Sequence, residues 1–134
     1  FGSALQGRML NSHPAVVPRF PGVNRGREPI EYGVRFSGAT VHFEDEAMDT
    51  GPVIIQAVVP VMHSDSEKAL MARIHAMEHR IYPQALQWLE QGRLRLHGRR
   101  VELIPDSEGG AEIAATLGES GEGPWMVSPA LEAF

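Results

Sequence analysis

A long segment of helical periodicity is the strongest constraint on the fold of this chain. Between residues 64 and 92, apolar positions recur at spacings of 4, 3, 4 and 7, which places them along one side of an α-helix. These positions are Leu70, Ile74, Met77, Ile81 and Trp88. Ser64 and Glu67 have the S-x-x-E spacing of a capping box, and Gly92 stands where a helix commonly ends. We therefore expect one long helix with a buried stripe and a kink at Pro83.

Segments rich in Val and Ile precede this helix and predict strands. Residues 38–44 and 52–59 have the composition of two strands, joined by the acidic turn EDEAMDTG. Residues 8–11 indicate a short buried strand, and residues 93–104 alternate with period two around a Gly, as in a hairpin. Residues 24–33 favour a short helix at best, because they contain both Gly and Pro. The pattern predicts an α/β fold with a mixed sheet, a long C-terminal helix and a terminal β-hairpin.

Charge and composition change near Pro105. All 12 Lys and Arg precede it, against 11 acidic residues, whereas residues 106–134 hold six acidic residues and no basic one. The first part is thus close to neutral, which argues against nucleic acid as its main partner. The last part is rich in Gly, Glu and Ser, so we expect residues 105–134 to form a mostly disordered acidic tail. Its final segment, PWMVSPALEAF, is apolar enough to dock on the domain.

Composition also excludes several kinds of protein. The 134 residues suffice for one domain or a piece of one, and the absence of Cys rules out disulfides and thiolate metal sites. No apolar run approaches the ~18 residues of a membrane span, and no secretory signal is visible. We expect a cytoplasmic protein without membrane contacts. The chain starts at Phe1 rather than at Met, which suggests a fragment.

The sequence NSHP places two polar side chains at the end of the first predicted strand. Pro14 biases His13 towards extended backbone, so Asn11 and His13 project to the same side. An amide donor beside an imidazole suits a developing oxyanion. The alternative is that Asn11 caps a turn and His13 is an ordinary loop residue, and these two residues alone favour it.

Asp49 supports the catalytic interpretation. It lies in the turn between two predicted strands, where loops commonly carry function. A carboxylate near His13 would raise the pKa of the imidazole and hold its ring in place. Asp is also a favoured turn residue, so spacing leaves both roles open.

Three motifs together resemble the C-terminal half of the glycinamide ribonucleotide formyltransferases, a family within the folate-dependent formyltransferase superfamily. They are LNSHPAVVPRFPG, SGATVHFEDEAMDTGPVIIQAVVPV and EHRIYPQALQWLEQGRL, and they occur in the family's order within residues 1–104. The resemblance implies that residues 1–104 are the catalytic half of a Rossmann-like formyltransferase domain. It also implies that the N-terminal nucleotide-binding half is absent, which makes that missing half an expected partner.

The resemblance assigns roles to individual residues. It implies that the catalytic residues are Asn11, His13 and Asp49, with His42 close behind them. Folate-binding roles are implied for Glu44, Asp45, Glu46, Ala47, Met48, Thr50 and Gly51. Ribonucleotide-binding roles are implied for Ser12, Pro14 and Glu78. The sequence departs from the family at Ser12, where Ile is usual, and at Ala15, where Ser often stands; these changes affect substrate detail and leave the three catalytic residues intact.

The implied reaction transfers a formyl group from 10-formyltetrahydrofolate to the amine of glycinamide ribonucleotide, in purine biosynthesis. No metal is implied, and an oligomer is compatible with the family. Other members of the superfamily, formyltetrahydrofolate hydrolase and methionyl-tRNA formyltransferase, share the Asn-His-Asp logic and remain alternatives. A further alternative is a half-domain that is inert or acts only by pairing with another chain.

A zinc site is a competing interpretation of the helix. HAMEH at residues 75–79 matches the H-x-x-E-H pattern of a zinc peptidase, with both histidines one turn apart. A third ligand cannot be placed, and the motif is short.

We expect three features in the geometry of the site. Asn11, His13 and Asp49 should converge, the Val17–Pro18 bond should be cis, and Glu78 should lie near the exit of the first strand. If that first strand is a central member of a parallel sheet, its missing neighbours should expose part of the apolar side chains. The residues concerned are Leu10, Val41, Phe43, Ile54 and Ile74.

Overall fold

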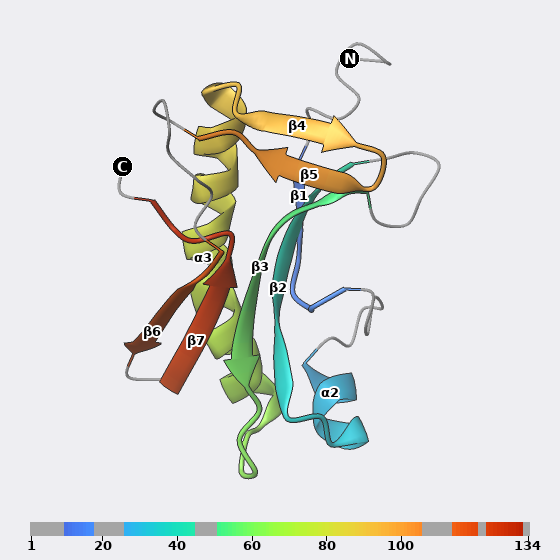
Figure 1. The fold of residues 1–134 in the computed structure, drawn as a ribbon. Helices are drawn as coiled ribbons and strands as arrows, with labels where there is room; N and C mark the ends of the chain where they lie inside the picture. The colour runs from blue at the N-terminus through green and yellow to red at the C-terminus, as the bar shows by residue number, and fades with distance from the viewer. Residues whose placement is uncertain (1–9, 18–25, 45–50, 106–113, 121–122, 133–134) are drawn as a thin grey trace.

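A mixed β-sheet and one long helix form the frame of the protein (Figure 1). The computed structural model describes residues 10–17, 26–44, 51–105, 114–120 and 123–132. Its helices are α2 (Arg27–Tyr32) and α3 (Glu67–Glu90). Its strands are β1 (Leu10–His13), β2 (Phe36–Phe43), β3 (Val53–Pro60), β4 (Leu94–His97), β5 (Arg100–Leu103), β6 (Thr116–Ser120) and β7 (Gly123–Ser128).

The sheet is organised around β2 and β3. Its main path runs β1-β2-β3-β5-β4, and β7 pairs with β3 and with β6. Among the described strands β3 and β5 are parallel, and the other pairs are antiparallel. The expected mixed sheet, long helix and hairpin at residues 93–104 are confirmed, although a second hairpin follows the first. The first strand, β1, pairs antiparallel with β2, its one strand neighbour among the described residues, and pairing at its other edge stays a prediction.

Helix α3 buries the stripe that the periodicity predicts. Leu70, Ile74, Met77, Ile81 and Trp88 are all buried. The N-cap is Ser66 rather than Ser64, since the Ser66 side chain accepts a hydrogen bond from the Ala69 N–H at 3.1 Å. Pro83 lies inside the helix, which continues to Glu90, and Gly92 follows it with a φ of +70°.

The expected exposure of core side chains is wrong for four of the five residues. Val41, Phe43, Ile54 and Ile74 are 5% exposed or less, and Leu10 is partly buried. The reason is that α3 packs on β2 and β3, while β7 extends the sheet from β3. The described strands and helix therefore enclose their own core.

The C-terminal segment corrects another expectation. Disorder over residues 105–134 is wrong for the residues that the structure describes there, because they form β6 and β7. Ala57 of β3 lies opposite Val127 of β7, which is fully buried. The prediction of disorder is based on the average composition of the segment. It does not take into account the alternation of apolar and polar positions, which indicates a strand.

Glu132 anchors this C-terminal segment to the rest of the protein. Its carboxylate accepts hydrogen bonds from the Trp88 indole at 2.9 Å and from two nitrogens of Arg93 at 2.6 and 2.9 Å. Its backbone N–H donates to the Gln84 side chain at 2.6 Å. The Arg93 guanidinium also donates to the Ile104 carbonyl oxygen, so one charged cluster joins helix, hairpin and C-terminal segment. Hydrogen bonding to Arg93 lowers the pKa of Glu132 below its ordinary value.

A loop after β1 is fixed against the sheet by Thr40. The Thr40 hydroxyl donates to the Ala15 carbonyl oxygen at 2.7 Å and accepts from the Gln56 amide at 3.0 Å and the Val17 N–H at 3.3 Å. Gly38 allows the close approach of the neighbouring strand β3, because a Cβ at this position would lie 1.8 Å from the Ala57 carbonyl oxygen. These contacts determine how the chain leaves β1.

We predict that Glu132→Gln lowers stability in a pH-dependent way. Because the pKa of Glu132 is depressed on folding, its contribution is present above the ordinary pKa of a carboxyl group. That contribution is lost as the pH falls through the folded-state value. Urea unfolding should show a loss of about 1 kcal/mol at pH 7, the size of a well-formed but partly exposed ion pair. The difference between variant and wild type should shrink in acid. Glu119→Gln, on the exposed side of β6, should behave like wild type, and an equal loss in both variants would contradict the anchor.

We predict that Thr40→Val destabilises the fold more than Thr40→Ser does. Valine keeps the shape but leaves buried donors and acceptors of the loop without a partner, which costs about 1–3 kcal/mol. Serine keeps the hydroxyl and should retain most of the stability. Thermal and urea unfolding of the two variants would measure this difference. Equal stability of the two would show that the hydroxyl does not hold the loop.

Candidate functional site

The register between β1 and β2 sorts the polar residues of the site onto two faces. Asn11 lies opposite His42 and His13 opposite Thr40, so these side chains share one face of the strand pair. Ser12 and its partner Val41 lie on the other face, where α3 packs. The structure thus brings Asn11, His13 and His42 together, as the sequence predicts for Asn11 and His13.

His42 is positioned as a buried, oriented imidazole. Its ring is 6.3 Å from that of His13 between centroids, and the residue is 3% exposed. Its Nδ1 lies 2.8 Å from the Phe43 carbonyl oxygen, which can only accept, so Nδ1 carries a proton. Nε2 is buried and has no hydrogen-bond partner among the described residues. The Phe43 carbonyl thereby fixes the tautomer of His42, in which Nε2 is the nitrogen that can accept a hydrogen bond.

Asn11 is exposed, and one hydrogen bond orients its side-chain amide. Its Oδ1 accepts a hydrogen bond from the Ser12 N–H at 2.9 Å. Among the described residues none accepts from its Nδ2, which carries two N–H donors. This is the polarity that an oxyanion requires.

Glu78 connects helix α3 to β1. Its Oε2 accepts a hydrogen bond of 2.5 Å from the Ser12 hydroxyl, across 66 positions of sequence. Its other oxygen, Oε1, lies 3.5 Å from the His75 ring. The position predicted for Glu78, beside the first strand, is confirmed. Pro14, the other residue assigned to this region, is buried.

A hollow of about 430 Å³ opens beside this contact. It is lined by Ser12, Glu78, His79, Tyr82 and Pro83. From the sequence, His79 is considered only as a zinc ligand and Tyr82 is not singled out, although they follow Glu78 by one and four positions on the same helix. The i to i+4 spacing was the signal that could have identified Tyr82.

The acidic turn remains a prediction. Asp49, with Asp45, Glu46, Ala47, Met48 and Thr50, lies outside the described residues, as does the Val17–Pro18 bond. The ends of the turn are described: Glu44 is exposed and Gly51 is buried. His42 pairs with Asn11 on one side and with Val53 on the other, so the turn joins the ends of β2 and β3 at the level of Asn11, with β2 between Asn11 and Val53.

No described group of three or more His, Cys, Asp or Glu could hold a metal ion. The H-x-x-E-H pattern instead places His75 beside Glu78, with 55% of the His75 side chain exposed.

Within the part of the chain that the structure describes, no helix is both long and apolar enough to cross a membrane.

Comparison with known proteins places the site in context. The chain is 44% identical over 97 residues to phosphoribosylglycinamide formyltransferase of Escherichia coli, covering 72% of this chain and 46% of that protein. It therefore spans about half the length of this relative. The crystal structure of glycinamide ribonucleotide transformylase 1 from Symbiobacterium toebii has 46% identity and a TM-score of 0.71, over 74% of this chain and 47% of that one.

A second enzyme type has the same architecture at lower identity. A formyltetrahydrofolate deformylase from Pseudomonas syringae has 27% identity and a TM-score of 0.70, over 74% of this chain and 33% of that one. The family model described as formyl transferase matches residues 1–86, which hold β1, β2, β3 and most of α3. That match covers well over half of the sequence, and the chain belongs to the formyl transferase family.

Proposed function

We propose that this chain carries the catalytic half of a glycinamide ribonucleotide formyltransferase, with 10-formyltetrahydrofolate as formyl donor. The observation that carries the proposal is the β1–β2 register, which groups Asn11, His13 and His42 beside the ends of the acidic turn. The names of relatives at 44% and 46% identity support the substrate.

The proposed mechanism is direct transfer. The amine of the ribonucleotide attacks the formyl carbon, forming a C–N bond and placing negative charge on the formyl oxygen. The Asn11 amide and a protonated His13 donate hydrogen bonds to that oxygen. Collapse of the intermediate breaks the bond to N10 of the folate, which takes a proton as the attacking amine loses one. Asp49 keeps His13 charged and relays the proton through water, and His42 packs behind the pair.

Substrate binding is divided between two regions in this proposal. The turn from Glu44 to Gly51 covers the folate. Ser12, Pro14 and Glu78 bind the ribonucleotide, where a carboxylate can accept hydrogen bonds from two neighbouring hydroxyls. The hollow beside Ser12 and Glu78 supports this assignment, since its polar groups come from both β1 and α3.

The activity is proposed for the chain together with a further segment. The chain spans 46% of the E. coli relative, and β1 has one strand neighbour among the described residues. In this proposal, a segment equivalent to the rest of that relative would pair along β1 and supply the substrate-phosphate site. An oligomer that supplied such a segment from another chain would satisfy the same requirement.

Deformylation is the second candidate function. The similarity to the Pseudomonas syringae deformylase supports it, because the same face of β1 would then activate water in place of an amine. Higher identity to the transformylases favours formyl transfer. The two differ in product, since hydrolysis releases formate whereas transfer yields a formylated ribonucleotide.

We predict that formyl transfer requires His13. The chain should be mixed with the N-terminal half of the E. coli relative, and formylated ribonucleotide and formate should both be measured. Activity should appear in the mixture and fall by about 10²–10³ in His13→Ala, the range for loss of an oxyanion donor. His97→Ala, on the exposed hairpin, is the matched control. Release of formate alone would favour deformylation, and full activity of His13→Ala would refute the site.

Glu78→Gln should separate ribonucleotide binding from folate binding. A carboxylate that accepts from hydroxyls contributes more than a neutral amide, so KM for the ribonucleotide should rise about tenfold. The KM for folate should stay unchanged, and so should both values in Glu90→Gln at the end of the same helix. An unchanged ribonucleotide KM would remove Glu78 from the binding site.

A further inference from the structure

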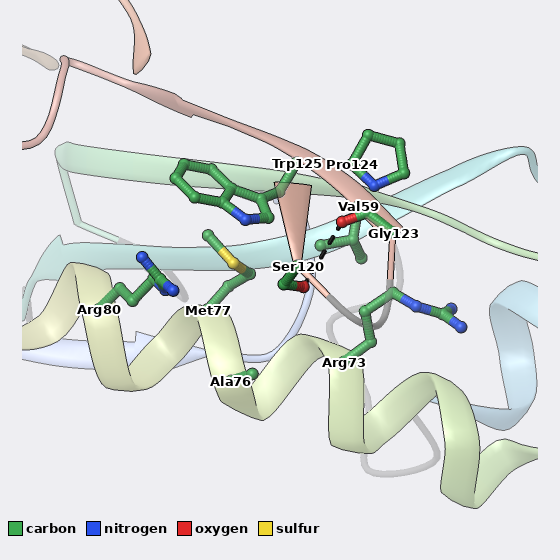
Figure 2. A pocket seen from close by; sticks show the side chains of 9 residues that line it. All are labelled: Val59, Arg73, Ala76, Met77, Arg80, Ser120, Gly123, Pro124 and Trp125. Atoms are coloured by element: carbon green, nitrogen blue, oxygen red, sulfur yellow. Dashed lines mark hydrogen bonds between the residues drawn. The ribbon is translucent and has the colours of Figure 1, made fainter. Parts of the chain in front are cut away.

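A second cavity lies between α3 and the β6–β7 hairpin, on a different flank of the helix from Ser12 and Glu78. Its volume is about 100 Å³, room for a few water molecules or a small group of similar size. Figure 2 shows Arg73, Met77 and Arg80 of α3 on one side and Ser120 and Trp125 of the hairpin on the other. The hairpin lies outside residues 1–86, so the family match does not explain this cavity.

Trp125 contributes an unsatisfied donor to this cavity. Its indole Nε1 is buried and makes no hydrogen bond to any residue that the structure describes. Buried polar atoms in folded proteins nearly always have a partner, and leaving one unpaired costs about 1–3 kcal/mol. In Figure 2 the indole nitrogen lies on the edge of the ring that faces Met77 and Ser120, so an acceptor bound in the cavity would reach this N–H after a small shift of the neighbouring side chains.

Arg80 supplies positive charge at the same place. Its guanidinium carbon is 5.0 Å from the centroid of the Trp125 ring, within the range of a cation–π contact. No described carboxylate forms an ion pair with Arg80. Arg73 differs, because its guanidinium pairs with Asp65 through bonds of 2.7 and 3.0 Å, and in Figure 2 it extends away from Trp125.

We propose that this cavity binds a small oxyanion, a phosphate or carboxylate group, through the Trp125 N–H and the Arg80 guanidinium. The described lining residues contain these donors, apolar side chains such as Val59 and Met77, and no carboxylate. A small cavity that offers N–H donors and a positive charge favours a ligand that accepts hydrogen bonds and carries a negative charge. The site would be a feature of the hairpin and independent of the formyl-transfer chemistry.

Nuclear magnetic resonance of the two indole N–H groups tests the proposal directly. The full 134-residue chain contains Trp88 and Trp125, and Trp125→Phe assigns their signals. Inorganic phosphate and acetate are titrated separately at constant ionic strength, with sodium chloride as reference. The Trp125 signal should shift saturably with at least one of the two anions, and the comparison tells a tetrahedral ligand from a planar one. The Trp88 signal should stay fixed, because its N–H is held by Glu132.

Variants then distinguish a site from a general salt effect. Arg80→Gln should weaken the binding roughly tenfold, since it removes a charged donor, whereas Arg80→Lys should retain part of it. Arg95→Gln, an exposed arginine on β4, should bind like wild type. In Trp125→Phe, the Gly123 amide serves as reporter and should show weakened binding. No saturable shift with either anion, an equal shift with chloride, or unchanged affinity in Arg80→Gln would overturn the proposal.

Discussion

Burial of β2 on both faces is the constraint on which the rest of the structure depends. Seven of its eight residues are buried, with α3 on one face and the loop after β1 held at Thr40 on the other. Because side chains alternate across a strand, a register shift of one residue between β1 and β2 would exchange the two faces. His42 would then point to α3, and Asn11 and His13 would lose their common neighbour. The chemistry of the site is therefore fixed by packing on both faces of one strand.

The elements with strong local patterns were predictable from sequence. The stripe from Leu70 to Trp88 follows a period that no strand could bury, so the helix was certain before its partners were known. Its cap was less certain, because Ser64 and Ser66 are both candidates. Asp65 resolves the choice: its carboxylate accepts from the Met62 N–H and pairs with Arg73, which closes a turn just before Ser66. That contact is tertiary, and spacing alone does not contain it.

Long-range pairings account for what sequence reasoning missed. The i, i+2 relation of Asn11 and His13 is local and could be derived, whereas the alignment of Asn11 with His42 requires the strand register. The C-terminal strands were missed because acidic and glycine-rich composition outweighed a short apolar alternation. The hydrogen bond from Trp88 to Glu132 spans 44 positions, and the sequence around neither residue indicates it. The fold class follows from patterns, but the partners of buried polar groups do not.

The cluster at Arg93 has a consequence for where this chain can be shortened. By composition, Pro105 looks like a natural boundary between a domain and an appendage. Cutting there would remove Glu132, whose carboxylate accepts from the buried Trp88 indole and pairs with the buried Arg93, and whose N–H donates to the buried Gln84 side chain. It would also uncover the edge of β3 that β7 occupies. The C-terminal segment is thus an integral part of the domain. A shortened chain that ended at Pro105 would need other groups to pair with β3 and to replace the contacts of Glu132.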